Sequence, residues 1–406
     1  MTWYTDGRLH HGVGIEDTFI PQERPGGRAL DEYDLTQHYH LWREDLRLAA
    51  HSGATLIRWG VPWYLVEPRA GTFDFSWLDE VMTELQHLGL RCVLDVMHYG
   101  TPLWLENSFL NPRYPELVAR YAAAVAARYP GVVDDLTPLN EPMVNAIWCG
   151  RDGRWPPYLT GQHGLVTVLM RLALGMVATQ RAVAAVRPEV AFVHVDAGFR
   201  WVGHGPDGLG VAEGNEWRFL ALDLITGRVT ESHPMHEYLV RHGASAADLA
   251  VLRRDAVTPD VVGVNYYPAF TTQAVDASGR EAPVEAGTDG LVDLLRAYHD
   301  RYGLPLAITE TSRSTPDVAE KCAWVDDLLD TVDTVRDEGL PVVAAFWFPL
   351  LDLYDWSYRE GTRPADEYLM PFGLVDLVRG ADRVLRRVPN AAFDRWRARV
   401  AGFPSR

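Results

Sequence analysis

Apolar and polar residues follow two patterns that alternate along the chain. Short apolar runs rich in β-branched residues predict buried strands, and longer segments with apolar residues every three to four positions predict amphipathic helices. The strands are expected at 12–18, 55–59, 91–97, 135–139, 190–195, 261–265, 305–309 and 342–348. The helices are expected at 35–52, 77–88, 115–129, 165–186, 215–225, 291–302, 317–338 and 391–400.

Glycines mark several points at which a predicted helix gives way to the next strand. Gly53, Gly89 and Gly339 follow helices directly, and glycine there can adopt the left-handed conformation that ends a helix. Eight strand–helix units predict an α/β fold, a closed (β/α)8 TIM barrel formed by residues 1–406 as a single domain. The alternative is an open doubly wound sheet, whose glycine-rich phosphate loop is not continued by the sequence at 12–17.

Composition narrows the partners that such a barrel would bind. The 38 Lys and Arg against 55 Asp and Glu give a charge of −17, which argues against nucleic acid and anionic membranes and is compatible with a neutral small molecule. The widely spaced Cys92, Cys149 and Cys322 fit neither a disulfide framework nor a zinc site, so we expect no metal and no cofactor.

The sequence also bears on location. The first residues lack the basic and apolar regions of a signal peptide, and no stretch approaches the roughly 20 apolar residues of a membrane span. We therefore expect a cytoplasmic protein with no membrane partner. The oligomeric state is left open.

Polar and aromatic side chains stand at or just after the predicted strands, where barrel enzymes carry their active residues. Because the carboxyl ends of all eight strands share one face, these side chains are expected to form a ring. Its members are Glu16, Arg58, His98, Asn140, Glu141, Asn265, Tyr267, Glu310, Asp352, Asp355 and Trp356.

Two members of this ring, Glu141 and Glu310, indicate a reaction. Each directly follows a predicted buried strand, the fourth and the seventh, and these strands lie roughly across the barrel from one another. A single glutamate after a strand is more often a helix cap or a solvated charge. Two carboxyls on opposed strands are what glycoside hydrolysis needs, because one protonates the leaving oxygen while the other attacks the anomeric carbon or activates water.

The sequences Asn-Glu-Pro at 140–142 and Ile-Thr-Glu at 308–310 resemble the two signature motifs of glycoside hydrolase family 1, the β-glucosidase family. Segments 263–267, 351–356 and 372–375 resemble three further motifs of this family. Arg58 and His98 fall where it keeps an arginine and a histidine. The resemblance runs from about residue 12 to residue 396, and its specificity lies in the ordered set of motifs.

The resemblance implies a retaining β-glycosidase that hydrolyses its substrate by double displacement through a covalent glycosyl-enzyme. It implies Glu310 as the nucleophile, supported by Arg58 and Tyr267, and Glu141 as the acid/base. The same resemblance implies that the remaining members of the ring bind the sugar. These are Glu16, His98, Asn140, Asn265, Asp352, Asp355 and Trp356.

The sequence departs from the family mainly in the residues expected to recognise the sugar. No glutamine aligns with the family glutamine of the first-strand motif, and Glu16, Asp17 or Gln22 is left to take its place. Asp355 stands where the family has a longer glutamate. We therefore expect a modified glycone, such as a deoxy or amino sugar, rather than plain glucose.

Two alternatives keep the same site. One is a non-hydrolytic enzyme of specialised metabolism, either a transglycosidase or a lyase or isomerase. The other is a silent sugar-binding protein, which the presence of both glutamates with Arg58 and Tyr267 argues against.

Overall fold

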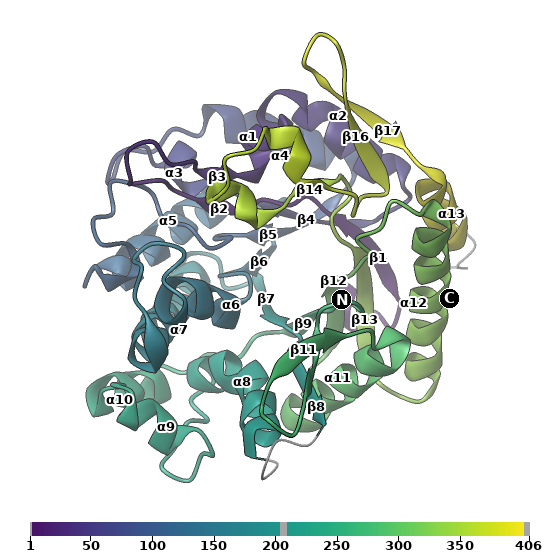
Figure 1. The fold of residues 1–406 in the computed structure, drawn as a ribbon. Coiled ribbons are helices and arrows are strands. Elements are labelled where there is room, and N and C mark those ends of the chain that lie inside the picture. The colour runs from purple at the N-terminus through teal and green to yellow at the C-terminus, as the bar shows by residue number, and fades with distance from the viewer. Residues whose placement is uncertain (1, 204–208, 402–406) are drawn as a thin grey trace.

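The computed structural model describes residues 2–203 and 209–401, and its centre is a closed barrel of eight parallel strands (Figure 1). Each strand pairs in parallel with its neighbours, and β1 closes the ring by pairing with both β13 and β4. This closure confirms the predicted (β/α)8 barrel and excludes the open sheet. The barrel strands are β1 (His10–Gly14), β4 (Leu56–Gly60), β5 (Arg91–Asp95), β6 (Asp135–Thr137), β7 (Ala191–Ala197), β9 (Val261–Asn265), β12 (Leu306–Glu310) and β13 (Val342–Trp347).

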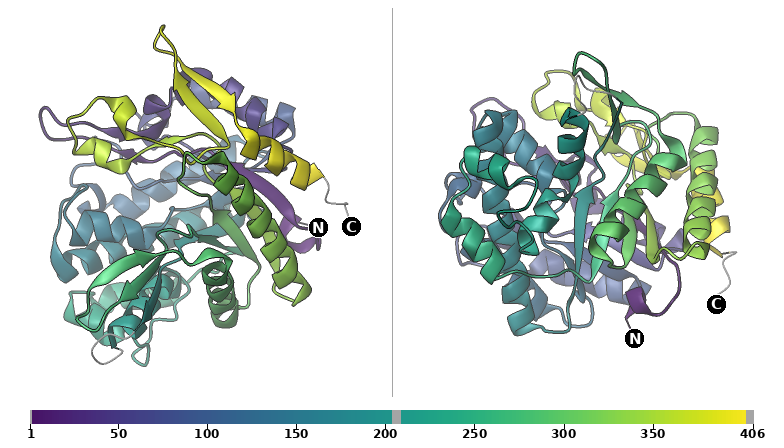
Figure 2. Two further views of the ribbon diagram at one scale, coloured as in Figure 1. Left: turned by 45° about the vertical axis from the view of Figure 1, so that its right-hand side comes forward. Right: turned by 90° about the horizontal axis from the view of Figure 1, so that it is seen from below.

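Helices form an outer layer around the strands (Figures 1 and 2). Each predicted helix is present with its ends moved by a few residues, and the first is divided between α1 (Glu32–Leu35) and α2. The main helices are α2 (His38–His51), α4 (Ser76–Leu88), α5 (Tyr114–Arg128), α7 (Gly161–Val186), α8 (Leu209–Ile225), α11 (Gly287–Tyr302), α12 (Val318–Asp337) and α13 (Ala391–Ala401).

The first strand differs most from its predicted position, since β1 ends at Gly14 and not at residue 18. The apolar run continues past Gly14, but the Glu16 carboxylate accepts a hydrogen bond from the Thr18 backbone N–H at 3.0 Å. This local bond competes with ladder pairing and turns the chain into a loop. The carboxyl group of Glu16 is thereby placed at the barrel mouth.

Apolar side chains fill the barrel interior, so the site is built on a packed core and not over a channel. Close packing also dictates the two glycines of β1. A Cβ atom on Gly12 would lie 2.3 Å from the Phe346 ring, and one on Gly14 would lie 2.1 Å from the Phe348 ring. These distances leave no room for a larger residue, and so the β1–β13 seam needs glycine at both positions.

Helix α7 is the longest apolar helix of the described residues, and it is long and apolar enough by composition to cross a membrane. The expectation that no stretch reaches that length and apolarity is therefore wrong. Within its most apolar window, which has a mean hydropathy of 1.3, 61% is buried in the fold. Its apolar residues pack against α5 and α6 (Pro142–Ala146), which accounts for them as part of the core.

Two insertions build the rim around the barrel mouth. After β7 the described chain forms β8 (Arg200–Gly203), α8, α9 (His236–Arg241) and α10 (Ala246–Arg254), and β8 joins β10 (Thr272–Val275) and β11 (Glu281–Val284) in a small sheet. After β13 come β14 (Leu353–Tyr354), β15 (Leu369–Met370), and the hairpin of β16 (Val375–Arg379) and β17 (Leu385–Pro389). The chain after β7 thus adds helices to the rim; residues 204–208 of that segment lie outside the described residues.

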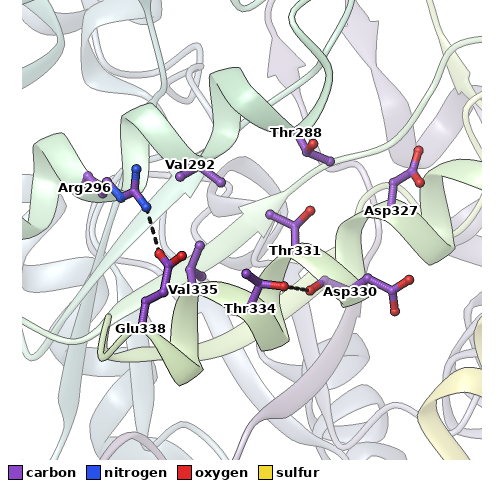
Figure 3. Close-up of a pocket in the computed structure, with 9 residues that line it drawn as sticks. All are labelled: Thr288, Val292, Arg296, Asp327, Asp330, Thr331, Thr334, Val335 and Glu338. Carbon is purple, nitrogen blue, oxygen red and sulfur yellow. Dashed lines mark hydrogen bonds and ion pairs between the residues drawn. The ribbon is translucent and has the colours of Figure 1, made fainter.

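A cavity of about 280 Å³ lies away from the strand ends, between α11 and α12 (Figure 3). Arg296 of α11 and Glu338, just after α12, form an ion pair at 2.7 Å beside it, and Thr334 donates a hydrogen bond to the backbone oxygen of Asp330 at 2.8 Å. Because these groups satisfy one another within the helical layer, we assign the cavity to the packing of the two helices.

Candidate active site

A pocket of about 550 Å³ opens at the carboxyl ends of the barrel strands. Most of the ring that the sequence predicted lines this pocket, whereas Arg58, Asn140 and Asp352 lie outside the lining among the described residues. The predicted residues in the lining are Glu16, His98, Glu141, Asn265, Tyr267, Glu310, Asp355 and Trp356.

Glu310 is the last residue of β12, and its side chain is held at both oxygens. Arg58 donates from Nη1 to Oε1 at 2.7 Å, and the Tyr267 hydroxyl donates to Oε2 at 2.7 Å. Glu310 is 4% exposed and Arg58 is fully buried. A carboxylate bonded to a guanidinium and a phenol is oriented and balanced in charge, as a nucleophile needs to be.

Arg58 lies beneath the pocket on β4 and connects several groups. Its Nη2 donates to Asp95 Oδ2 at 2.5 Å and to Asn140 Oδ1 at 3.1 Å, while Nη1 holds Glu310. A planar guanidinium can reach all three acceptors from one fixed position, which a lysine ammonium could not match. Arg58 therefore holds Glu310 from beneath the pocket without lining it, and its support of a nucleophile stays a prediction.

Glu141 directly precedes α6 and occupies an unusual backbone conformation, with a φ of 43°. Its Oε2 accepts from the Tyr99 hydroxyl at 2.6 Å, and its Oε1 accepts from Asn265 Nδ2 at 2.9 Å. Both donors are neutral, in contrast to the guanidinium at Glu310. Burial, and then the nearby charge of Glu310, raise the pKa of Glu141 to about 7.

The two carboxyls therefore have different chemical characters. Glu310 is paired with a permanent cation, and Glu141 holds a proton up to neutral pH. Two carboxyls in such different environments can divide the roles of nucleophile and acid.

Asn140 connects the surroundings of the two carboxyls. Its Oδ1 accepts from Arg58 and from Asn265 Nδ2, the latter at 3.2 Å. Its Nδ2 lies 2.8 Å from His98 Nε2 and donates to the Tyr99 hydroxyl at 3.0 Å. All four hydrogen-bonding positions of the amide are therefore used within the protein. Asn140 fixes the geometry of the site, and its contact with a sugar hydroxyl stays a prediction.

Asn265 stands at the end of β9 and completes this frame. It accepts at Oδ1 from the Thr309 hydroxyl at 2.7 Å, next to Glu310, and donates to Glu141. One amide thus holds Glu141 in register with β12, so that the two carboxyls keep a constant relation.

His98 follows β5 and is held from both sides. Its Nδ1 lies 2.8 Å from Asp17 Oδ1, and its Nε2 faces the Asn140 amide and lies 3.6 Å from Glu16 Oε1. Burial lowers the pKa of His98, but the charges of Asp17 and Glu16 outweigh it and raise this pKa well above its ordinary value. His98 lines the pocket, and its predicted role in sugar binding stays a prediction.

The structure separates the three candidates for the place of the family glutamine. Among these three described residues, Glu16 alone lines the active-site pocket. Asp17 lies behind His98 as its hydrogen-bond partner. Gln22 uses its amide to donate to the backbone oxygen of Arg28 at 3.0 Å and to accept from the backbone N–H of Arg24 at 2.8 Å, which leaves it in its own loop.

Asp352 has a different role from the one predicted. Its two oxygens accept from the backbone N–H groups of Gly373 at 2.9 Å and Leu377 at 3.0 Å. These bonds tie the chain after β13 to the start of the β16–β17 hairpin. Since the carboxylate is buried there and lies outside the pocket lining, its assignment to sugar binding was wrong.

Asp355 and Trp356 do reach the pocket. Asp355 also accepts from the Ser357 backbone N–H at 2.7 Å, which begins a short helix, η4 (Trp356–Arg359). Trp356 packs edge-on to the Tyr99 ring, with centroids 5.5 Å apart. The strand-eight segment therefore supplies one acidic and one aromatic surface to the pocket.

Sequence reasoning missed much of the aromatic lining. Tyr99 stands next to the predicted His98, so its position after a strand was a usable signal. The others come from the rim insertions and from the chain after Glu141, and their approach to the strand ends depends on loop conformation. These further aromatic residues are Trp148, Phe199, Trp201, Phe270 and Phe372.

Asp17, Asp95 and His98 bring possible metal-ligand atoms within 4.8 Å of one another. Each is already engaged, because His98 bonds to Asp17 and Arg58 donates to Asp95. Arg58 also supplies the positive charge that a cation would bring. We therefore interpret the trio as part of the hydrogen-bond network beneath the pocket.

Comparisons with known proteins agree with this geometry. The glycoside hydrolase family 42 model, described as β-galactosidase, matches residues 34–131. A β-galactosidase of Sulfolobus acidocaldarius is 22% identical over 352 residues, which cover 80% of this chain and 69% of the relative. An aryl-phospho-β-D-glucosidase of Bacillus subtilis is 23% identical over 424 residues, which cover 91% of this chain and 82% of the relative.

Among solved structures, the family 1 β-glucosidase from Thermotoga maritima has the same fold, with a TM-score of 0.80 at 16% identity, covering 98% of this chain and 97% of that one. The fold, the paired carboxyls and these likenesses define the class of protein, a glycoside hydrolase on a (β/α)8 barrel. Within that class the chain is similar both to the family 42 β-galactosidase model and to β-glucosidases of family 1.

Proposed function

We propose that the chain is a retaining β-glycosidase, with Glu310 as nucleophile and Glu141 as acid/base. The observation that carries this proposal is the contrast between the two carboxyls of one pocket. Glu310 accepts from Arg58 and Tyr267, whereas burial and Glu310 raise the pKa of Glu141 to about 7. A retaining reaction needs an ionised group and a protonated group at the same bond.

In the first step a Glu310 oxygen attacks the anomeric carbon while the bond from that carbon to the aglycone oxygen breaks. The proton of Glu141 moves to the leaving oxygen, so the aglycone departs as a neutral alcohol. Glu310 then holds the glycosyl group as an ester and has lost its charge. Arg58 keeps its bond to Asp95, which leaves the guanidinium balanced during this intermediate.

In the second step Glu141 takes a proton from water, and the water oxygen attacks the anomeric carbon. The ester bond breaks and returns the electron pair to the Glu310 carboxylate. Loss of the Glu310 charge in the intermediate removes one cause of the high pKa of Glu141. The same residue can therefore be an acid in one step and a base in the next.

The test is to trap the covalent intermediate. A 2-fluoro glycoside with a dinitrophenyl leaving group is incubated with the enzyme, which is then digested and analysed by mass spectrometry. We expect the fluoroglycosyl group on the peptide that contains Glu310, and no label in a Glu310→Gln variant. Label on another carboxyl, with turnover retained in Glu310→Gln, would refute the assignment.

The acid/base has its own signature. Glu141→Gln should lose most activity on substrates with poor leaving groups and keep the first step on dinitrophenyl glycosides, whose phenolate needs no proton. Added azide should then restore turnover and give a glycosyl azide of unchanged anomeric configuration. An inverted product would exclude double displacement.

We propose further that the glycone differs from plain glucose. Support comes from Glu16, a carboxylate that can only accept hydrogen bonds when ionised, at the place where the resemblance implies an amide that can also donate. Asp355 gives part of its hydrogen-bonding capacity to Ser357. The test is a panel of nitrophenyl β-glycosides of neutral, deoxy and amino sugars; a kcat/KM highest for glucose in both the wild type and Glu16→Gln would contradict the proposal.

A further inference from the structure

Tyr99 makes the shortest described hydrogen bond to the acid/base. The residue lies just after β5 and is 1% exposed. Its hydroxyl donates to Glu141 Oε2 at 2.6 Å and accepts from Asn140 Nδ2 at 3.0 Å. Because the amide occupies the acceptor side of the hydroxyl, the phenolic hydrogen is directed at Glu141.

The backbone of Tyr99 is in the left-handed region, with a φ of 79°. This conformation costs a bulky residue energy, and it persists only where the surroundings impose it. Asn145, in α6 behind Glu141, donates from its side chain to the Tyr99 carbonyl at 3.2 Å. The next residue is Gly100, where a Cβ atom would lie 1.9 Å from the Phe19 carbonyl oxygen.

Aromatic neighbours fix the ring itself. The centroid of the Tyr99 ring is 5.3 Å from that of Trp155 and 5.5 Å from that of Trp356, and the His98 ring lies edge-on at 4.7 Å. Strained backbone, packed ring and paired hydroxyl together leave the phenolic oxygen with a single position. That position is within hydrogen-bond distance of one oxygen of Glu141.

We propose that Tyr99 is the positioning residue of the acid/base, and that its hydroxyl orients the Glu141 carboxyl and stabilises its ionised form. This inference rests on the proposed function, in which Glu141 must lose its proton in the first step and accept one in the second. A donor directed at a carboxylate favours the ionised form and opposes the effect of burial. Asn265 donates to the other oxygen, so the carboxyl is held from two sides.

Tyr99 and Asn265 nevertheless differ in what else they hold. Asn265 is bonded to Thr309, next to the nucleophile, so its replacement disturbs both carboxyls. Tyr99 bonds to Glu141 and to Asn140, which keeps its other partners without it. Removing the Tyr99 hydroxyl therefore tests the acid/base with little change at Glu310.

The experiment compares Tyr99→Phe with the wild type. Phenylalanine keeps the ring between the tryptophans and removes only the hydroxyl. We expect the alkaline limb of the kcat/KM profile to move up by about one pH unit, a tenfold change in acidity, because the ionised form of Glu141 loses a charge-assisted bond. With a dinitrophenyl glycoside, for which the second step limits the rate, kcat should fall about tenfold as the carboxyl loses its orientation.

Tyr121→Phe is the matched control. The Tyr121 ring is fully buried, stacks on Trp63 with centroids 5.0 Å apart, and its hydroxyl donates to the Val61 carbonyl at 3.1 Å, outside the pocket lining. This variant also removes one buried tyrosine hydroxyl, so it should show a similar loss of thermal stability with an unchanged pH profile. A pH profile that moves equally in both variants would overturn the proposal.

A second measurement needs no turnover. The protein is labelled with ¹³C at the glutamate carboxyls, the Glu141 signal is assigned by its absence in Glu141→Gln, and the signal is titrated in the wild type and in Tyr99→Phe. We expect a higher pKa for Glu141 in Tyr99→Phe. An unchanged pKa in the folded variant would overturn the positioning role whatever the activity.

If Tyr99→Phe does not fold, 3-fluorotyrosine incorporated at position 99 replaces it. Fluorine makes the hydroxyl a stronger donor and keeps the ring, so the pKa of Glu141 should move downward, and no movement would overturn the proposal. Failure to trap an intermediate on Glu310 with any glycoside would instead refute the proposed function. The titration distinguishes these two failures.

Discussion

Replacement of Glu310 by glutamine should change the proton affinity of Glu141, although the two residues are 169 positions apart in the chain. The pKa of Glu141 rises from an ordinary 4.5 to about 7, with burial as the larger cause and the Glu310 charge as the second. The Glu310→Gln substitution removes the second cause and leaves the first. It also preserves the shape of the side chain, so the pocket should keep its form.

The magnitude follows from the order of the two causes. Because burial accounts for more of the change than Glu310 does, we expect the substitution to lower the pKa of Glu141 by about one pH unit, or about 1.4 kcal/mol. The pKa should then remain above its ordinary value. This variant also imitates the glycosyl-enzyme, in which Glu310 carries no charge.

The assay is a carboxyl titration by ¹³C NMR, with Glu281→Gln as the control. Glu281 belongs to the exposed end of the pocket lining and is not among the groups that raise the pKa of Glu141, so its removal should leave the titration unchanged. An unchanged pKa in Glu310→Gln would refute the coupling on which the change of role depends. A fall to the ordinary value would show that burial contributes nothing.

Three further substitutions test other parts of the site. Above pH 7 the folded wild type contains an ionised, buried Glu141, whereas below pH 4 this residue is protonated in both the folded and the unfolded state. In urea titrations the unfolding free energy of Glu141→Gln, relative to that of the wild type, should therefore be about 2 kcal/mol higher at pH 8 than at pH 5. An equal difference at the two pH values would contradict the raised pKa of Glu141. Arg58→Lys keeps the positive charge but cannot bond to Asp95 and Glu310 at the same time through two nitrogens, so kcat/KM should fall about 100-fold. A fall of less than threefold would show that the positive charge alone is enough to support Glu310. Asp352→Asn should lower the unfolding free energy by about 1–2 kcal/mol and leave KM unchanged. A raised KM with unchanged stability would instead support a role of Asp352 in sugar binding.

The barrel and the position of its two opposed glutamates could be predicted from sequence because both depend on local periodicity and on strand ends. Parallel strands buried on both faces give continuous apolar runs, and a residue directly after such a run has to lie at the barrel mouth. Glu141 and Glu310 satisfied this condition. The support of Glu310 by Arg58 was implied by the family resemblance alone, and the structure shows the hydrogen bond between these two residues.

Two errors come from carboxylate side chains that accept hydrogen bonds from the backbone. Glu16 ended β1 early because its carboxylate bonds to Thr18, and Asp352 left the sugar-binding ring because two amides of a distant hairpin use its oxygens. Spacing along the chain does not reveal which partner a carboxylate selects. Tyr99 stands after a strand, next to the predicted His98, but the sequence does not show the left-handed backbone that brings its hydroxyl to Glu141.

The saturated amide of Asn140 has a consequence for how such an enzyme can change over time. The groups around the two carboxyls are cross-linked through this residue and anchored at the barrel strands, whereas Phe199 and Phe270 come from loops of the rim. Substitutions in the loops can accumulate without disturbing the proton transfers, while a change at Asn140 disturbs several at once. The fold thus separates a constant reaction module from an adaptable recognition module, and libraries aimed at new substrates should vary the loops and leave Asn140 unchanged.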